Sequence, residues 1–321
     1  MRKIAFSLSL ATLLGLGLHL DSAQAQSART FVSAARGDDA NPCDSVAAPC
    51  RTFQAAHGKT LSDGEVTVLD PGGYGGLTIT KSISIVNDGV GEASVLVSGG
   101  GTGITVDAPN SYVNLRGITI QGIGFGGGTG LVFSSGFALT ITNCIVRNHT
   151  GNGIELLPHA TSHVAIANTL AAYNGGSGVF IRPSGSDAMK LTLNRVEAVN
   201  NSVDGVFVSG QFMTAPAKLD AVVVDSKAVA NGSIGFASFS TGGGGITSLM
   251  LVNSVAQGNR IAGISSDSII STVRIGHSTV VGNVVTWRTL HNAVIESFGD
   301  NYVSGNADGD PGFPLPLVGK N

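Results

Sequence analysis

Charged and aromatic residues are scarce in this sequence. Of its 321 residues, 12% are charged and 6% are aromatic, whereas 42% are hydrophobic. Disordered chains combine high charge with low hydrophobicity, so this composition excludes that class. The net charge of −3 also gives no sign of the basic surface that nucleic-acid binding requires. We therefore expect a folded protein without a nucleic-acid partner.

Long apolar runs are absent beyond the N-terminus. There, a basic pair at residues 2–3 precedes an apolar run over residues 4–18, and residues 23–25 (Ala-Gln-Ala) match the small-x-small pattern of a cleavage site. A membrane anchor is the alternative, but the run is short for a span of roughly 20 residues. We expect residues 1–25 to be a signal peptide and the mature chain to have no membrane span. The protein would then be periplasmic or extracellular.

Cysteine is also rare, with three residues. Cys43 and Cys50 lie close together in a proline-containing loop, and in an exported protein this spacing is typical of a local disulfide. Two free surface thiols are the alternative. A metal site would need more ligands, and only His57 is near, so we expect no metal. Cys144 is expected to be a buried small residue and not a nucleophile.

Glycine, in contrast, is abundant, and five of the 46 glycines have a fixed spacing. A polar residue precedes each of them by ten positions, and an extended, largely apolar triplet follows. The five pairs are Asn143–Gly153, Asn168–Gly178, Arg195–Gly205, Asp225–Gly235 and Asn253–Gly263. Constant internal spacing with variable repeat length is typical of a stacked solenoid, because variation collects in loops.

The segments before the polar residues alternate between apolar and other side chains. Residues 139–141 and 164–166 have a period of two, which predicts strands and not an amphipathic helix. Successive strands without a helix between them fit a parallel β-helix, in which each strand pairs with its counterpart in the next coil. Asparagine suits the turn because it tolerates the left-handed region and its amide can bond between coils. We predict an all-β, single-domain parallel β-helix over residues 64–310.

The two ends are expected to differ from the coils. Residues 26–63 are predicted to form an N-terminal cap with the disulfide and a short helix over residues 51–59, N-capped by Thr52. A cap covers the apolar surface and unpaired backbone that the end of a solenoid exposes. Residues 122–130 are expected to form a loop that leaves the stack, and residues 311–321 a C-terminal tail or cover.

The repeat glycines are expected to need a backbone conformation that is costly for any residue with a side chain. On this interpretation, valine at Gly205 destabilises the protein far more than valine at Ser209, which we place in the loop beyond the strand.

The coils resemble the right-handed parallel β-helix repeats of the pectin-lyase-like superfamily. The resemblance rests on steps such as Asn143-Cys144 and Asn253-Ser254, each followed by a Gly-Ile restart. Residues 41–53 and the Asp-Pro-Gly-Gly-Tyr sequence at 70–74 look like an exported bacterial subgroup of such proteins. This resemblance implies a right-handed coil. It leaves function open, since the scaffold serves lyases, hydrolases, epimerases and non-catalytic binders.

Three catalytic signatures associated with this scaffold are absent. The Asp-Asp and Gly-His-Gly pairing of polygalacturonases is matched only in part at residues 276–278, and residues 157–159 do not replace the Asp-Pro-His-Asp of alginate epimerases. The Arg-x-Pro-x-x-Arg stretch of pectate lyases is also missing. We therefore predict a cofactor-free protein that binds an extended, acidic polysaccharide on its outer face. A lyase or epimerase acting on uronate polymers, and a non-catalytic surface spacer, are the alternatives.

The register of the repeat gives a column of outward side chains, two positions after each glycine. In this column Glu155, Phe180 and Phe207 should be neighbours on successive coils. Two outward phenylalanines in a row are unusual on a solvated sheet and can stack on a sugar ring. The alternative is that the loops after Arg182 and Gly210 fold over them.

Charged residues lie in the turns beside this column. A lyase needs a base for the proton next to the uronate carboxylate and a cation to stabilise that carboxylate, and Glu155, His159 and Arg182 are the candidate catalytic residues. An exposed ion pair worth under about 1 kcal/mol is the alternative. The candidate substrate-binding residues are Phe180, Phe207, Arg182 and Asp187.

Opposite charges also meet on adjacent coils away from this column. The register places Arg195 beside Asp225 and Glu197 beside Lys227, which predicts two structural ion pairs.

Overall fold

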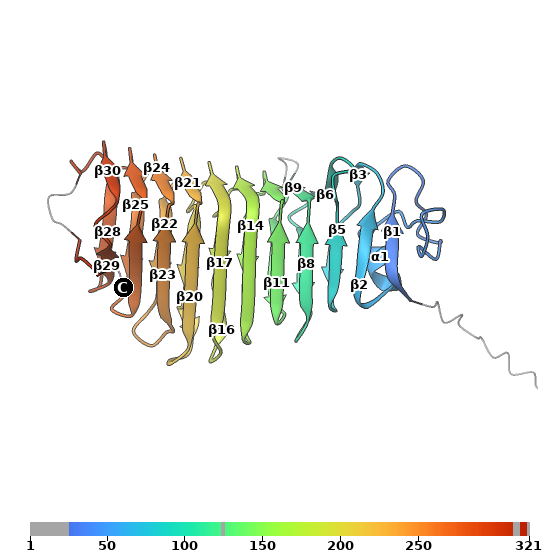
Figure 1. The fold of residues 1–321 in the computed structure, drawn as a ribbon, viewed down its shortest axis with the longest axis horizontal. Coiled ribbons are helices and arrows are strands. Elements are labelled where there is room, and N and C mark those ends of the chain that lie inside the picture. Colours follow the sequence, from blue (N-terminus) through green and yellow to red (C-terminus); the bar gives the residue numbers. More distant parts are fainter. Residues whose placement is uncertain (1–25, 123–125, 311–314, 320–321) are drawn as a thin grey trace, which may run out of the picture.

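The protein is an elongated stack of coils (Figure 1), seen in a computed structural model that describes residues 26–122, 126–310 and 315–319. The predicted signal peptide and part of the 122–130 insertion lie outside the described residues. So does most of the predicted tail, but Leu317 forms a bridge to Ser297 at the last coil. No helix in the described part of the chain is long and apolar enough to cross a membrane.

Most coils contribute two strands to a 19-stranded sheet and one strand to a nine-stranded sheet, and every neighbouring pair is parallel. This confirms the predicted β-helix. The first strands of the coils are β1 (Ser27–Val32), β2 (Thr60–Val68), β5 (Ile83–Val86), β8 (Tyr112–Arg116), β11 (Ala138–Thr142), β14 (Ser162–Ala172), β17 (Met189–Val199), β20 (Lys218–Val224), β23 (Ile246–Val252), β26 (Ser271–Gly276) and β29 (Val294–Ser297).

The second strands of the coils continue the 19-stranded sheet beyond a bend; in β14 and β17 both parts form one long strand. The remaining second strands are β3 (Gly72–Gly73), β6 (Ala93–Val97), β9 (Ile118–Gly122), β12 (Ile145–Arg147), β21 (Lys227–Val229), β24 (Val255–Gln257), β27 (Thr279–Val281) and β30 (Tyr302–Ser304).

The nine-stranded sheet closes the coils, and each repeat glycine lies directly before the start of one of its strands or at the second position of that strand. The strands of this sheet are β4 (Leu77–Ile79), β7 (Thr102–Asp107), β10 (Thr129–Ser135), β13 (Ile154–Leu156), β15 (Val179–Ile181), β18 (Val206–Ser209), β22 (Ile234–Phe239), β25 (Ala262–Asp267) and β28 (Val285–Leu290). Two short strands in the loops, β16 (Ser184–Gly185) and β19 (Phe212–Met213), pair with each other.

The bend inside each coil, here called the first corner, lies at the polar residue of the repeat. Its members share a left-handed backbone with φ between 48° and 56°: Asn143, Asn168, Arg195, Asp225, Asn253 and His277. The predicted pair of Glu197 and Lys227 forms, with 2.9 Å between Oε1 and Nζ. The predicted pair of Arg195 and Asp225 is wrong. Arg195 instead donates to Asn168 Oδ1 on the preceding coil, and Asp225 accepts from Asn253.

A second left-handed corner, which the sequence analysis missed, lies just before the nine-stranded sheet. Its members are Asn148, Tyr173, Asn200, Ala230, Gly258, Gly282 and Gly305. The residue after each of them points inward, and from the coil of β14 onward that residue is asparagine. These buried residues are Asn174, Asn201, Asn231, Asn259, Asn283 and Asn306.

The inward asparagines form a continuous hydrogen-bonded ladder. Each side-chain amide donates to the Oδ1 atom of the next asparagine at 2.9–3.0 Å, and that oxygen also accepts a backbone N–H. The second amide hydrogen bonds a carbonyl of the preceding coil, as from Asn201 to Ala171. We expected the amide ladder at the first corner, where the side chains face solvent. The buried ladder belongs to the second corner, where these groups must be paired because water is excluded.

The repeat glycines are required by close packing and not by backbone conformation. None of the five has a positive φ. A Cβ atom at Gly205 would lie 2.6 Å from the carbonyl oxygen of Gly235 and 2.9 Å from Nδ2 of Asn231, closer than real Cβ atoms approach. The predicted conformational reason is therefore wrong. The prediction also placed Ser209 in a loop, which is wrong. Ser209 is the last residue of β18 and is buried.

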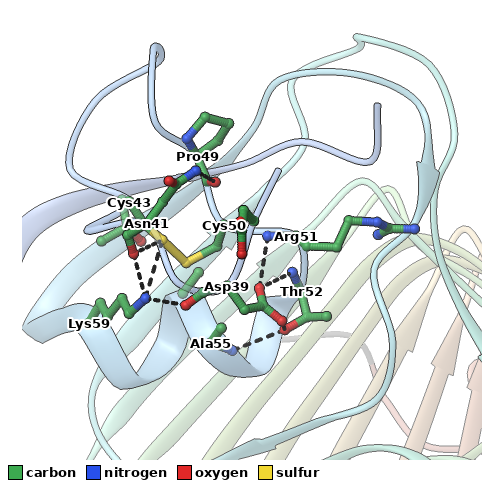
Figure 2. Close-up of a disulfide and its surroundings, with 12 residues drawn as sticks. Asp39, Asn41, Cys43, Pro49, Cys50, Arg51, Thr52, Ala55 and Lys59 are labelled. Carbon is green, nitrogen blue, oxygen red and sulfur yellow. Dashed lines mark hydrogen bonds between the residues drawn. A yellow bond between two sulfur atoms is a disulfide. The ribbon is translucent and has the colours of Figure 1, made fainter. Parts of the chain in front are cut away.

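The N-terminal end carries the expected helix and disulfide. Helix α1 (Phe53–Lys59) is N-capped by Thr52, whose hydroxyl accepts the N–H of Ala55 at 3.2 Å. Cys43 and Cys50 form the disulfide. Figure 2 shows Asp39 tying this loop to the helix: its carboxylate accepts the N–H groups of Arg51 and Thr52 at 2.8 and 2.9 Å. The cap is thus cross-linked by a covalent bond and by a charge-assisted network.

Candidate functional site

The outer face of the nine-stranded sheet carries the predicted column of side chains. In the strand register Val132 is beside Glu155, Glu155 is beside Phe180, Phe180 is beside Phe207, and Phe207 is beside Ala237. The spacing of the glycines therefore predicted the neighbours correctly. Glu155, Phe180 and Phe207 are all partly exposed, as expected for outward positions.

The phenylalanines of this column stack on one another. The ring centroids of Phe180 and Phe207 are 5.3 Å apart with an interplanar angle of 10°, and Phe239 continues the stack at 6.2 Å from Phe207. Rings stacked along the coil axis cover each other's faces and turn their edges outward. A sugar lying along the axis would therefore meet an apolar strip of ring edges. Sequence reasoning missed Phe239, which occupies the next outward position of the longer strand β22.

Arg182 is held between two aromatic rings. Its Cζ atom lies 5.1 Å from the ring centroid of Phe180 and 4.8 Å from that of Phe212. Phe212 comes from the next coil, and the pairing of β16 with β19 brings it there. The loop after Gly210 thus folds toward the column, as in the alternative weighed from the sequence. In the part of the chain that the structure describes, Arg182 forms no ion pair, so its charge is not neutralised by a carboxylate.

The other predicted site residues are not joined to Arg182. Glu155 accepts hydrogen bonds from Asn152 Nδ2 at 2.6 Å and from Thr129 Oγ1 at 3.4 Å. His159 is exposed in the turn after β13, and Asp187 is exposed before β17. Across the described ranges no hydrogen bond or ion pair links Glu155, His159 and Arg182. The structure therefore assembles Glu155, Phe180, Phe207 and Arg182 on one face and leaves His159 and Asp187 in flanking loops.

A pocket of about 390 Å³ lies near the C-terminal end of the stack. Phe239, Ile269, Asp267 and His291 line it, and His291 Nδ1 is 2.7 Å from Asp267 Oδ1. The repeat pattern could not predict this pair, because His291 lies beyond Gly263, the last glycine with the fixed spacing. Among residues 26–122, 126–310 and 315–319, no cluster of three or more His, Cys, Asp or Glu side chains is placed to hold a metal ion.

Comparison with known sequences agrees with this geometry. Residues 67–217, which include the outward column from Thr78 to Phe207, match the family described as a right handed beta helix region. The match and the parallel strand register agree that the chain folds as a right-handed β-helix. No curated protein sequence matches it as a relative.

Two solved structures share the right-handed β-helix fold. The pectate lyase Pel9A is 16% identical with a TM-score of 0.62, and the match covers 88% of this chain and 77% of the lyase. The Dettilon tailspike protein gp208 is 12% identical with a TM-score of 0.50, and the match covers 84% of this chain and 61% of the tailspike. At these identities the likeness shows the fold alone.

Proposed function

We propose that this β-helix protein is exported and binds an acidic polysaccharide along the outer face of its nine-stranded sheet. The observation that carries the proposal is the position of Arg182, whose guanidinium lies between Phe180 and Phe212 without a carboxylate partner among the described residues. A cation kept on an exposed face without an internal partner is available to an external anion.

The two rings suit Arg182 to this task. Stacking on aromatic faces fixes the plane of a guanidinium and leaves its N–H edge free. That edge can bind a carboxylate through two parallel, charge-assisted hydrogen bonds. Because the planar head is already ordered, less side-chain entropy is lost on binding.

The stacked rings supply the rest of the surface. Phe180, Phe207 and Phe239 form an apolar strip along the coil axis, and Glu155 lies at one end of it. Coils repeat about every 4.8 Å, so an extended polymer along the axis can touch several coils at once. Each contact is weak, and affinity should increase with the length of the oligosaccharide.

Binding is favoured here over a lyase or epimerase reaction. Glu155 is engaged by Asn152, and it has no hydrogen bond to His159 or Arg182 in the described structure. The name of the pectate lyase Pel9A states a polysaccharide substrate, which supports the same class of ligand for this fold. Export is supported by the Cys43–Cys50 disulfide, because such bonds persist in oxidising compartments.

The test is calorimetric titration of the protein with hexagalacturonate and with cellohexaose. We expect Arg182→Gln to weaken hexagalacturonate binding about tenfold, since a hydrogen bond to a charged group is worth roughly 1.5 kcal/mol. Arg195→Gln, which removes an exposed arginine from another edge, is the matched control and should bind like wild type. Equal affinities for the three proteins would contradict the proposal. Ultraviolet absorbance of an unsaturated product would instead identify a lyase.

A further inference from the structure

One residue of the second corner does not suit its backbone conformation. Tyr173 has φ = 57°, at a position where the other coils carry asparagine, alanine or glycine. The left-handed region is uncommon for a bulky residue and is disfavoured there. Tyr173 is also 60% exposed, so burial of its ring does not offset this cost. A strained, exposed aromatic side chain that the core does not use points to a function.

Hollows lie on both sides of Tyr173. One has a volume of about 640 Å³ and is lined by Gln121, Asn148 and His149, and the other has about 440 Å³ and is lined by Asn200 and Arg260. Tyr173 and Ser202 line both, so the two hollows form one groove along the stack. We call this the corner groove, and its residues are Gln121, Asn148, His149, Tyr173, Asn200, Ser202 and Arg260. It follows the turns before the nine-stranded sheet and does not include Arg182 or the phenylalanine column.

Several polar side chains of the corner groove have no partner within the protein. The side chains of Asn148, Asn200 and Ser202 make no hydrogen bond to another described residue, and Arg260 forms no ion pair with one. The amides of Asn201 and Asn231 bond to each other in the ladder, whereas these amide and hydroxyl groups are available to a bound molecule.

His149 lies at the wall of the corner groove with its ring buried. It takes the first position of the asparagine ladder and is 2% exposed. Its Nε2 atom lies 3.2 Å from the carbonyl oxygen of Ile120, which can only accept, so Nε2 carries the proton. Burial lowers the pKa of the ring, although the bond to Ile120 acts in the opposite direction, so the ring is neutral near pH 7. Its Nδ1 atom is then an acceptor without a partner, but it is buried from solvent, so the open bonding groups of the groove are those of Asn148, Asn200 and Ser202.

We propose that the corner groove binds a neutral glycan chain, with one sugar ring stacked on Tyr173 and hydroxyl groups bonded to the side chains of Asn148, Asn200 and Ser202. An aromatic face beside amide and hydroxyl groups matches a sugar, which has apolar faces and a rim of hydroxyls. The lining contains no carboxylate and only one charged residue, Arg260, at its end. A chain is expected and not a single sugar, because Gln121 and Arg260 lie on coils several steps of about 4.8 Å apart. The proposal does not rest on the site at Arg182.

The experiment is calorimetric titration with four neutral hexasaccharides, those of β-1,4-glucan, α-1,4-glucan, β-1,4-mannan and chitin. At least one should bind, and Tyr173→Ala should weaken it about fivefold, as expected for the loss of one stacked ring. Ser202→Ala should also weaken binding. It removes an exposed hydroxyl that bonds no described residue, so the ladder and the melting temperature should be retained. Tyr302→Ala removes a tyrosine that is 73% exposed at the last coil, and it should bind like wild type.

The same titrations separate this groove from the acidic site. Tyr173→Ala should bind hexagalacturonate like wild type, and Arg182→Gln should bind the neutral hexasaccharide like wild type. The proposal is overturned if none of the four hexasaccharides binds, if Tyr173→Ala or Ser202→Ala binds as tightly as wild type, or if Tyr302→Ala or Arg182→Gln loses the neutral ligand.

Discussion

His57 is a buried base on the single helix of the cap. It is 5% exposed, and its Nε2 atom accepts the N–H of Thr80 at 3.3 Å, which requires a neutral ring. Burial, with a smaller contribution from the charge of Lys81, lowers the pKa of His57 from 6.5 to about 4. Between these two pH values the unfolded chain binds a proton that the folded chain excludes. Stability from this residue is therefore complete above pH 6.5 and is lost as the pH falls toward 4.

Replacing His57 with glutamine should remove this pH dependence. Glutamine keeps an acceptor for Thr80 but does not titrate. Between pH 7 and pH 4, the free energy of unfolding should fall by roughly 2–3 kcal/mol more in wild type than in His57→Gln, given about 1.4 kcal/mol for each unit of pKa shift. Urea unfolding at both pH values measures it. Burial also lowers the pKa of His149, but this residue is present in both proteins, so its contribution to the pH dependence cancels in the comparison. Parallel losses in the two proteins would show that His57 is already charged or solvated in the fold.

Cys144 should be chemically inert in the folded protein. It is 3% exposed, and burial raises the pKa of its thiol to about 11, so little thiolate forms at neutral pH. We expect iodoacetamide at pH 8 to modify no thiol before unfolding, one after unfolding, and three after reduction. Mass spectrometry counts the adducts. Two or three adducts without reductant would mean that Cys43 and Cys50 are not paired.

At the scale of one coil, the repeat glycine is the position with the least room. A methyl group at Gly205 would meet the backbone of Gly235, whereas one at the exposed Gly242 has nothing within 4 Å. Overpacking of this kind costs about 1–3 kcal/mol. Gly205→Ala should therefore lower the free energy of unfolding by that amount, and Gly242→Ala should leave it nearly unchanged. If chemical denaturation gives the two variants the same stability, the tight contact between coils does not exist.

The asparagine ladder should stabilise the stack more than the corner residues that face solvent. Asn231→Ala removes one buried amide, so the backbone N–H and one amide hydrogen of Asn201 lose their acceptor and the carbonyl of Ala198 loses a donor. An unsatisfied buried polar group costs about 1–3 kcal/mol. Asn253→Gly, at the exposed first corner, removes a surface bond to Asp225 but keeps a residue that tolerates the left-handed backbone, so it should cost less than about 1 kcal/mol. Thermal unfolding of both variants compares the two corners, and a larger loss in Asn253→Gly would contradict the account.

The strands and their register could be predicted because every coil repeats the same spacing. The ladder was missed, although asparagine stands four positions before Gly178, Gly205 and Gly235. We expected the ladder at the first corner, where the residue is asparagine, arginine or aspartate, but the side chains of that corner face solvent. The conformational reason given for the glycines failed because close contacts between coils come from packing, which a single coil's sequence does not show.

For the whole molecule, the candidate site was predicted only in part. The neighbours Glu155, Phe180 and Phe207 follow from the register, which extends along the entire stack. The contact between Arg182 and Phe212 does not follow from the register. Phe212 reaches Arg182 through a loop of the next coil, and the β16–β19 pairing sets the path of that loop. Glycan contacts on two different edges of one solenoid would let it bind an acidic and a neutral chain at the same time.

The most direct measurement of the central claim is a crystal structure of the protein with hexagalacturonate. The account predicts a uronate carboxylate within about 3 Å of the guanidinium of Arg182, with the sugar chain along the strip formed by Phe180, Phe207 and Phe239. An oligosaccharide bound elsewhere, with Arg182 still covered only by Phe180 and Phe212, would contradict it.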